Sequence, residues 1–210
     1  MMLRELPVDA YLESVASDAP APGGGSASAF CGAQGAGLIA MVAGLTLKCR
    51  KCEAYRSAAS AVQAAAQSAA AALTAQIDAD AEAFDRVSAA FRLPKSTERE
   101  VQLRSGEIQK ASIYAAEVPF RTMELARDVL KAAQPLLDGF NTSAASDLGV
   151  AALGLRSAVH GAWLNVAINC AGLKDAEKAN GLRARGLAIL KEAESLSETL
   201  RKAAETAIGI

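Results

Sequence analysis

Aromatic residues are scarce in this sequence, and neither sign of charge dominates it. Phe, Trp and Tyr make up 4% of the 210 residues, whereas hydrophobic residues make up 51% and alanine alone roughly a quarter. A chain this rich in small apolar side chains can form a core of closely packed helices, which excludes disorder. The formal net charge of −1 provides no field that would gather nucleic acid, so the expected partner is a small molecule or another protein.

Cysteine and histidine are also rare. The four cysteines are irregularly spaced, as in a protein of a reducing compartment, and Cys49-x-x-Cys52 lacks the second pair that a structural zinc site needs. We therefore expect no metal. The single histidine argues against a Ser-His-Asp triad. The opening residues carry acids and no apolar run of signal-peptide length, so we expect a cytoplasmic protein.

Charged residues are absent from Ala19 to Leu47, a run long enough to raise the question of a membrane span. The run is rich in Gly, Ala and Ser, has Gln34 in its middle and contains a Pro/Gly break. These features are typical of a helix buried among other helices. We therefore expect a core helix and no membrane partner.

Strand patterns are missing as well. Apolar residues recur at helical spacing nearly everywhere, and no alternating β-branched run is flanked by turn signals. The sequence predicts an all-α, long-helix up-and-down bundle that forms a single domain over residues 1–210. The expected helices are a short one near 8–17, one over 26–47 with Ser26 as N-cap, one over 53–91, one capped by Ser96 or Thr97 and kinked at Pro119, one from 141–147 to 173, and one from 175 to the C-terminus.

A glycine-rich stretch, PAPGGGSASA, precedes the uncharged helix. It has neither the Lys-Ser/Thr ending of a Walker motif nor the strand that precedes a dinucleotide fingerprint, so both nucleotide-binding motifs are excluded. Two interpretations stay open from the residues alone. The stretch is either a tight turn between helices or a loop whose backbone N–H groups, at a helix N-terminus, hold an anion or a carbonyl group.

Four acidic residues lie close together in IDADAEAFD, within the long helix. At about 100° per residue, Asp78, Glu82 and Asp85 share one face, which is typical of a solvated face. Asp80 points away from them, toward the apolar side of the helix. A carboxylate directed toward a core must be hydrogen-bonded, paired or functional, so Asp80 is either a capping or paired group or a catalytic one.

Two amides interrupt an otherwise apolar segment further along the chain. Asn165 and Asn169 are four residues apart and therefore share one helix face. Amides inside a buried helix need hydrogen-bond partners. The partners are either groups on neighbouring helices or the ring nitrogens and oxygens of a ligand.

Several motifs occur together in a fixed order: PAPGGGSASA, IDADAEAFDRV, LPK, EVPF, NTSAASDLGVAAL and LNVAIN. In this order and spacing, over nearly the whole chain, the sequence resembles the cyclodeaminase/cyclohydrolase family of folate enzymes. That family includes the C-terminal half of formiminotransferase-cyclodeaminase and stand-alone methenyltetrahydrofolate cyclohydrolases. The resemblance implies an all-helical homodimer that takes a tetrahydrofolate derivative as substrate, without metal and without a tightly bound cofactor.

Two activities are implied by the resemblance. In methenyltetrahydrofolate cyclohydrolase, water adds to the methenyl carbon of 5,10-methenyltetrahydrofolate and the ring opens to 10-formyltetrahydrofolate. In formimidoyltetrahydrofolate cyclodeaminase, N10 attacks the formimidoyl carbon, ammonia leaves and 5,10-methenyltetrahydrofolate forms. The sequence shows no formiminotransferase half, so we expect the cyclohydrolase. The alternative from another class is a non-catalytic helical dimerisation protein.

The resemblance also implies roles for individual residues. Asp80 matches the family's proposed catalytic aspartate, and Asp147 is a second catalytic candidate. A carboxylate can draw a proton from water or N10 and stabilise the neighbouring amidinium charge. The implied substrate contacts are Gly23, Gly24, Gly25 and Ser26 in the loop, Asn165, Asn169, Asn141 and Ser146 at the pterin or carbonyl groups, and Arg50, Lys51 and Lys95 at the glutamate carboxylates.

The sequence departs from the family pattern at four positions. Cys49 and Cys52 do not match the family's run of basic residues, Phe140 stands where a glycine usually precedes the asparagine, and Ala167 stands where many relatives have arginine. We expect these positions to decide whether substrate contacts, or the activity itself, are altered.

Overall fold

The chain folds as a bundle of long helices. The computed structural model describes residues 2–210, and no strand occurs among them. This confirms the all-α class and the order of helices predicted from the sequence. The α-helices are α1 (Val8–Val15), α2 (Gly24–Lys48), α3 (Arg56–Phe91), α4 (Glu98–Ala133), α5 (Ala145–Ala171) and α6 (Ala176–Ile208), and the short 3-10 turns are η1 (Leu3–Glu5), η2 (Arg50–Tyr55), η3 (Gln134–Leu136) and η4 (Thr142–Ala144).

Small side chains let the helices approach closely. The uncharged helix α2 packs between α3 and α5. A Cβ atom on Gly35 would lie 2.7 Å from Leu155 Cγ and 3.1 Å from backbone atoms of α5, so this contact requires glycine. Among residues 2–210, α2 is the one helix long and apolar enough to span a membrane, and here it lies against other helices of the core.

Local signals set where the helices begin. The Thr97 hydroxyl accepts a hydrogen bond from the Glu100 amide at 3.2 Å, and the Glu100 carboxylate accepts one from the Thr97 amide at 2.9 Å, which completes a capping box for α4. α4 runs through Pro119 as one helix. The predicted start of α2 at Ser26 is wrong by one turn, because the N-cap is Gly23. Ser26 lies in the first turn and donates its hydroxyl to α3.

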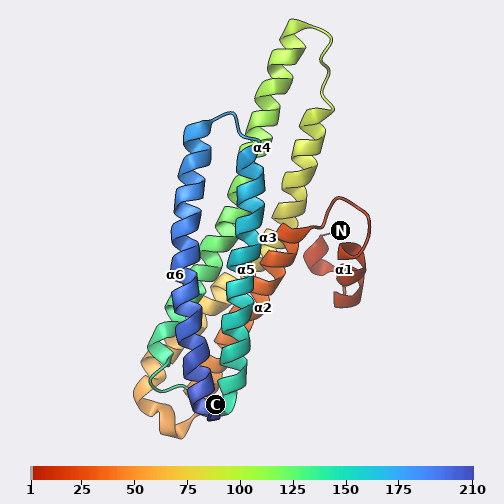
Figure 1. Ribbon diagram of the computed structural model, residues 1–210. Coiled ribbons are helices and arrows are strands. Elements are labelled where there is room, and N and C mark those ends of the chain that lie inside the picture. Colours follow the sequence, from red (N-terminus) through yellow and green to blue (C-terminus); the bar gives the residue numbers. More distant parts are fainter. Residues whose placement is uncertain (1) are drawn as a thin grey trace.

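The bundle has two different ends. The α3–α4 hairpin extends beyond α5 and α6, and the start of α2 and the end of α5 lie below this extension (Figure 1). We call this the hairpin end. The opposite end holds residues 49–55 and 134–147, where three 3-10 turns connect the helices, and we call it the loop end.

Candidate active site

Asp80 lies on α3 against the first turn of α2. Its Oδ2 accepts a hydrogen bond from the Ser26 backbone amide at 2.8 Å. The Ser26 hydroxyl lies 2.8 Å from the Ile77 carbonyl oxygen and 3.2 Å from the same Oδ2, so its single proton is shared between two acceptors. The carboxylate thus occupies the position of a capping anion at the positive end of α2.

Only one of the two carboxylate oxygens is held in this way. Within residues 2–210, Oδ1 of Asp80 accepts no hydrogen bond. The carboxylate fits here because of Gly25, since a Cβ atom at that position would overlap both Oδ1 and Cγ. The glycine run is therefore more than a tight turn: it allows the α2 backbone to approach a carboxylate on another helix.

Asp80 borders a cavity of about 350 Å³ at the hairpin end, a volume within the range of small-molecule sites. The sequence singled out Asp80, the glycine run and the asparagine pair on separate grounds, and all three groups border this cavity. Its lining residues are Pro20, Ala21, Gly23 and Gly24 of the loop and the start of α2, Asp80, Ala83, Phe84 and Val87 of α3, Ala115 of α4, and Asn165 and Asn169 of α5.

Each asparagine is fixed by its amide nitrogen. Asn165 Nδ2 donates to the Gly161 carbonyl oxygen at 2.9 Å, and Asn169 Nδ2 donates to the Ala115 carbonyl oxygen on α4 at 2.7 Å. The two side-chain oxygens accept no hydrogen bond from the described residues. Both interpretations of the pair therefore hold in part, because the nitrogens bond within the bundle while the oxygens can accept from donors in the cavity.

Burial controls the charge of Asp80. Loss of solvation raises the pKa of the Asp80 carboxyl above its ordinary value, and the hydrogen bonds from Ser26 act in the opposite direction. Among the described residues, the cavity lining contains no Lys or Arg that would favour ionisation. Asp80 is thus a carboxylate in a partly dry site, a setting that strengthens a general base.

Tyr11 of α1 is a neighbour of the site that the sequence did not reveal. Burial, and then the charges of Cys31 and Asp80, raise the pKa of its phenol. Its hydroxyl is buried and has no hydrogen-bond partner within residues 2–210. The only sequence signal was a short N-terminal helix, and nothing local indicates that its tyrosine packs close to an aspartate on α3.

The other acids of IDADAEAFD differ from one another. Glu82 and Asp85 are exposed, as predicted for a solvated face. Asp78 is not: its Oδ1 accepts a hydrogen bond from the Leu3 amide at 2.6 Å, and its Oδ2 lies 3.4 Å from Arg4 Nε. The prediction of a solvated Asp78 is therefore wrong, because this residue fastens the N-terminal segment to α3.

The remaining predicted contacts lie away from Asp80. Asp147 is in the first turn of α5, about 27 Å along the helix axis from Asn165. Asn141 is also at the loop end, where its side-chain oxygen accepts from the Ser143 amide at 3.2 Å. One chain therefore does not bring these residues to the Asp80 cavity. The other predicted contacts outside the cavity are Ser146, Arg50 and Lys51 at the loop end and Lys95 at the hairpin tip.

The four departures from the family pattern also lie outside the cavity lining. Cys49 and Cys52 are free thiols next to and within η2, and Phe140 is buried in the core. Ala167 is on α5 and does not border the cavity. In the described part of the chain, no group of three or more His, Cys, Asp and Glu residues could hold a metal ion.

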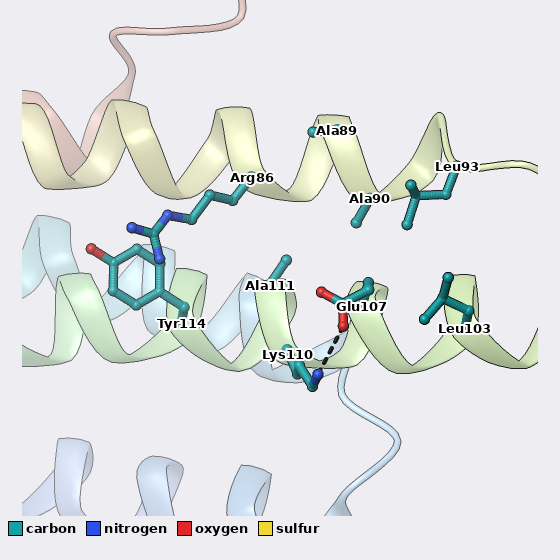
Figure 2. Close-up of a pocket in the computed structure, with 9 residues that line it drawn as sticks. All are labelled: Arg86, Ala89, Ala90, Leu93, Leu103, Glu107, Lys110, Ala111 and Tyr114. Carbon is teal, nitrogen blue, oxygen red and sulfur yellow. Dashed lines mark hydrogen bonds and ion pairs between the residues drawn. The ribbon is translucent and has the colours of Figure 1, made fainter.

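A larger cavity, of about 670 Å³, lies between α3 and α4 on the hairpin (Figure 2). Its polar side chains are paired with one another. The Arg86 guanidinium lies 4.4 Å from the centre of the Tyr114 ring, and Lys110 Nζ is 2.8 Å from Glu107 Oε1. The smaller Asp80 cavity is the better candidate for chemistry, because it has a carboxylate oxygen and two amide oxygens that lack partners.

The chain is similar to known proteins along most of its length. The profile of the formiminotransferase-cyclodeaminase family matches residues 7–186. A methenyltetrahydrofolate cyclohydrolase of Methylorubrum extorquens is 35% identical over 193 residues, which cover 92% of this chain and 93% of that protein. The formimidoyltransferase-cyclodeaminase of Rattus norvegicus is 35% identical over 186 residues, or 89% of this chain, but this chain spans only 34% of that protein.

A solved structure is similar over the whole chain. It is the crystal structure of a formiminotetrahydrofolate cyclodeaminase from Thermotoga maritima, with a TM-score of 0.80 and 27% sequence identity. The match covers 98% of this chain and 96% of the other. The arrangement of the helices is therefore shared with that protein.

Proposed function

The chain belongs to the formiminotransferase-cyclodeaminase family, and from this premise we propose that it is an enzyme of folate one-carbon metabolism, a methenyltetrahydrofolate cyclohydrolase. The observation that carries the proposal is the Asp80 carboxylate, held through one oxygen and free at the other, beside a cavity with two available amide oxygens. The similar protein of nearly equal length from Methylorubrum extorquens carries the cyclohydrolase name.

Asp80 acts as the general base of this reaction. A water molecule adds to the methenyl carbon between N5 and N10, and Oδ1 takes the proton that the water loses as the carbon–oxygen bond forms. Oδ2 stays bonded to Ser26, which fixes the direction of the carboxylate. Asp80 passes this proton to N5, the bond from the carbon to N5 breaks, and the proton of the remaining hydroxyl group leaves to solvent as the C=O bond forms, which leaves the formyl group on N10. The negative charge of Asp80 also stabilises the amidinium cation of the substrate.

The rest of the cavity binds the pterin. Its amino and ring N–H groups are donors, and they match the free side-chain oxygens of Asn165 and Asn169. Phe84, which is 41% exposed, and Val87 provide an apolar wall for the ring face. The two glycines in the lining keep the loop side of the cavity open. No metal or tightly bound cofactor takes part in this scheme.

Formimidoyltetrahydrofolate cyclodeaminase is the second candidate function. The structure from Thermotoga maritima, similar over the whole chain, carries that name. The same carboxylate would take the proton from N10 as it attacks the formimidoyl carbon, and the nitrogen that leaves as ammonia would be protonated. Both reactions pass through a tetrahedral carbon between two nitrogens, so the same residues serve either.

The proposed homodimer is supported by an uncovered apolar surface, which we call the α2–α5 face. On α5, about 40 Å long, Leu164 is 68% and Ile168 70% exposed. With α2 alongside, the face is two helices wide. A second copy of the chain is the proposed occupant. The large apolar residues exposed there are Met41, Val150, Leu153, Leu164 and Ile168.

The proposal is tested by adding purified protein to 5,10-methenyltetrahydrofolate and following the loss of methenyl absorbance against the uncatalysed rate. Formimidoyltetrahydrofolate is assayed in parallel. We expect Asp80→Asn to lower kcat by about a hundredfold or more, with the helical circular-dichroism spectrum unchanged. Asp85→Asn, on the exposed face of the same helix, is the matched control and should keep full activity.

Two results would contradict the proposal. Full activity in Asp80→Asn would remove this carboxylate from the mechanism. No acceleration on either substrate by the unaltered protein would leave the non-catalytic dimerisation protein as the better interpretation.

A further inference from the structure

Two of the four cysteines, Cys49 and Cys52, have no part in the proposed function. They lie at the loop end, where α2 passes into η2. Both are free thiols; Cys49 is partly exposed and Cys52 is buried. The other two cysteines are on separate helices, Cys31 on α2 and Cys170 on α5. Cys49 and Cys52 are therefore the pair to consider for chemistry between thiols.

A tight turn brings these two cysteines together. The Cys52 amide donates a hydrogen bond to the Cys49 carbonyl oxygen at 3.2 Å, which closes a four-residue turn. In such a turn the Cα atoms of the first and fourth residues lie within about 7 Å, and a disulfide joins residues whose Cα atoms are about 4.4–6.8 Å apart. The backbone is thus already arranged for a disulfide, and the two thiols already interact through a hydrogen bond.

Contacts on both sides hold this turn in place. On the α2 side, the Asn141 amide donates to Thr46 Oγ1 at 3.0 Å, three residues before Cys49. On the α3 side, the ring of Tyr55 packs directly on Gly139, where a Cβ atom would overlap it. A turn held between two fixed points keeps its thiols close, so closing a disulfide costs little further conformational freedom.

The two thiols are suited to different steps of one exchange. A hydrogen bond from Cys52 lowers the pKa of the Cys49 thiol, and the backbone amides of Lys51 and Cys52 and the charge of Lys51 act in the same direction. Burial, and then the neighbouring Cys49, raise the pKa of Cys52 to about 11. Cys49 is therefore the thiol that ionises first and the one that a molecule in solution can reach.

We propose that Cys49 and Cys52 form a reversible disulfide, with a low-molecular-weight disulfide such as oxidised glutathione as the oxidant. The Cys49 thiolate attacks one sulfur of the oxidant, which forms a mixed disulfide and releases one small thiolate. Cys52 loses its proton and attacks Cys49 Sγ, which forms the protein disulfide and releases the second small thiolate. Two electrons pass from the cysteine pair to the oxidant, and the two thiol protons end on the two released thiols.

The accessibility of Cys49 determines what kind of disulfide this is. Small thiols can attack a partly exposed sulfur, so the bond can be reduced again in the folded protein. Disulfides of reducing compartments are transient and redox-sensing in the same way. The pair is therefore a redox-responsive site and not a structural cross-link.

Mass spectrometry of the folded protein tests the proposal. Reduced protein is incubated with excess oxidised glutathione. We expect it to lose two hydrogen atoms and two of its four thiols, with the disulfide mapped between Cys49 and Cys52, and dithiothreitol should restore both thiols. Cys52→Ser removes the second attacking thiol, so one glutathione should stay bound to Cys49. Cys49→Ser should form neither product.

Two further variants make the result specific. Cys170→Ser is the matched control, because Cys170 is also buried but has no other cysteine near it in the sequence. It should oxidise like the unaltered protein. Cys52→Ala should hold glutathione as Cys52→Ser does, whether or not the buried position accepts a hydroxyl group.

Three results would overturn the proposal. They are four thiols remaining in excess oxidant, a glutathione adduct that persists on the unaltered protein, and a disulfide mapped to Cys31 or Cys170. None of these measurements involves a folate. A disulfide at Cys49 and Cys52 in a protein without turnover would reject the folate reaction and support the redox site, and the reverse result would separate the two in the same way.

Discussion

At the scale of single residues, Gly25 and Asp80 occupy positions that depend on each other. The carboxylate takes the space that a side chain at Gly25 would fill. We expect Gly25→Ala to displace Asp80 from Ser26 and to lower kcat by about a hundredfold, the loss expected for a misplaced general base. The measurement is the methenyl assay together with circular dichroism.

Gly106→Ala provides the control for this substitution. No atom lies within 4 Å of a Cβ built at Gly106 in α4. It should therefore leave kcat unchanged. If Gly25→Ala is as active as Gly106→Ala, the close approach of α2 has no part in catalysis.

Ser26 should influence the pH below which kcat/KM falls, the acid limb of its pH profile. Burial raises the pKa of Asp80, and the two hydrogen bonds from Ser26 lower it. Ser26→Ala removes the hydroxyl and keeps the amide, so the pKa of Asp80 should rise and the acid limb of kcat/KM should move to higher pH. A purely structural role would lower kcat without moving the limb.

What the sequence predicted at this scale was limited to local geometry. Helical spacing placed Asp80 apart from its three acidic neighbours, and it does face α2 and the cavity. The side chain of Ser26 suits an N-cap, yet a carboxylate from α3 caps the helix and glycine begins it. The error at Asp78 has a similar origin, since its partners Leu3 and Arg4 are distant in sequence.

At the scale of elements, the contact between α2 and α5 depends on glycine. A Cβ atom on Gly35 would lie 2.7 Å from Leu155 Cγ and 3.1 Å from the α5 backbone, which cannot yield as a side chain can. We expect Gly35→Ala to lower the free energy of unfolding by about 1–3 kcal/mol, despite the better helix propensity of alanine. Urea unfolding followed by circular dichroism measures this change.

The opposite sign is expected where glycine has open space. Gly106→Ala should raise the free energy of unfolding by about 0.5–1 kcal/mol, because nothing opposes the gain in helix propensity. If Gly35→Ala and Gly106→Ala change the free energy of unfolding equally, then α2 and α5 can move apart to accept a methyl group without cost, and the contact does not require glycine.

Helix boundaries were the most predictable feature, because their signals are local. The sequence placed the cap of α4 at Ser96 or Thr97, and the capping box at Thr97 lies there. The end of α3 at Phe91 also agrees, since the LPK break follows it directly. The tertiary partners of these helices could not be predicted in the same way, because alanine-rich surfaces fit several neighbours about equally well.

At the scale of the whole molecule, the α2–α5 face should hold two chains together. Ile168 is 70% exposed in the single chain, so Ile168→Glu should leave the monomer folded and prevent association by burying a charge at the interface. Sedimentation velocity measures the change in mass. Leu187→Glu on α6, at a residue 56% exposed and outside the face, is the control and should remain dimeric.

The candidate site shows where sequence reasoning stops at this scale. The motifs occur in one order along the chain, which suggested a single constellation including Asp80, Asp147 and Arg50. In the folded chain they divide between the two ends of a bundle whose central helices are about 40 Å long. A single sequence does not record how far apart its motifs lie once the long helices have folded.

Association of two chains through the α2–α5 face is subject to mass action. If each site needs two chains, the rate per chain falls on dilution once the concentration drops below the dissociation constant of the pair. The rate per chain then depends on the cellular abundance of the protein. At low expression, total turnover rises with the square of the chain concentration rather than in proportion to it.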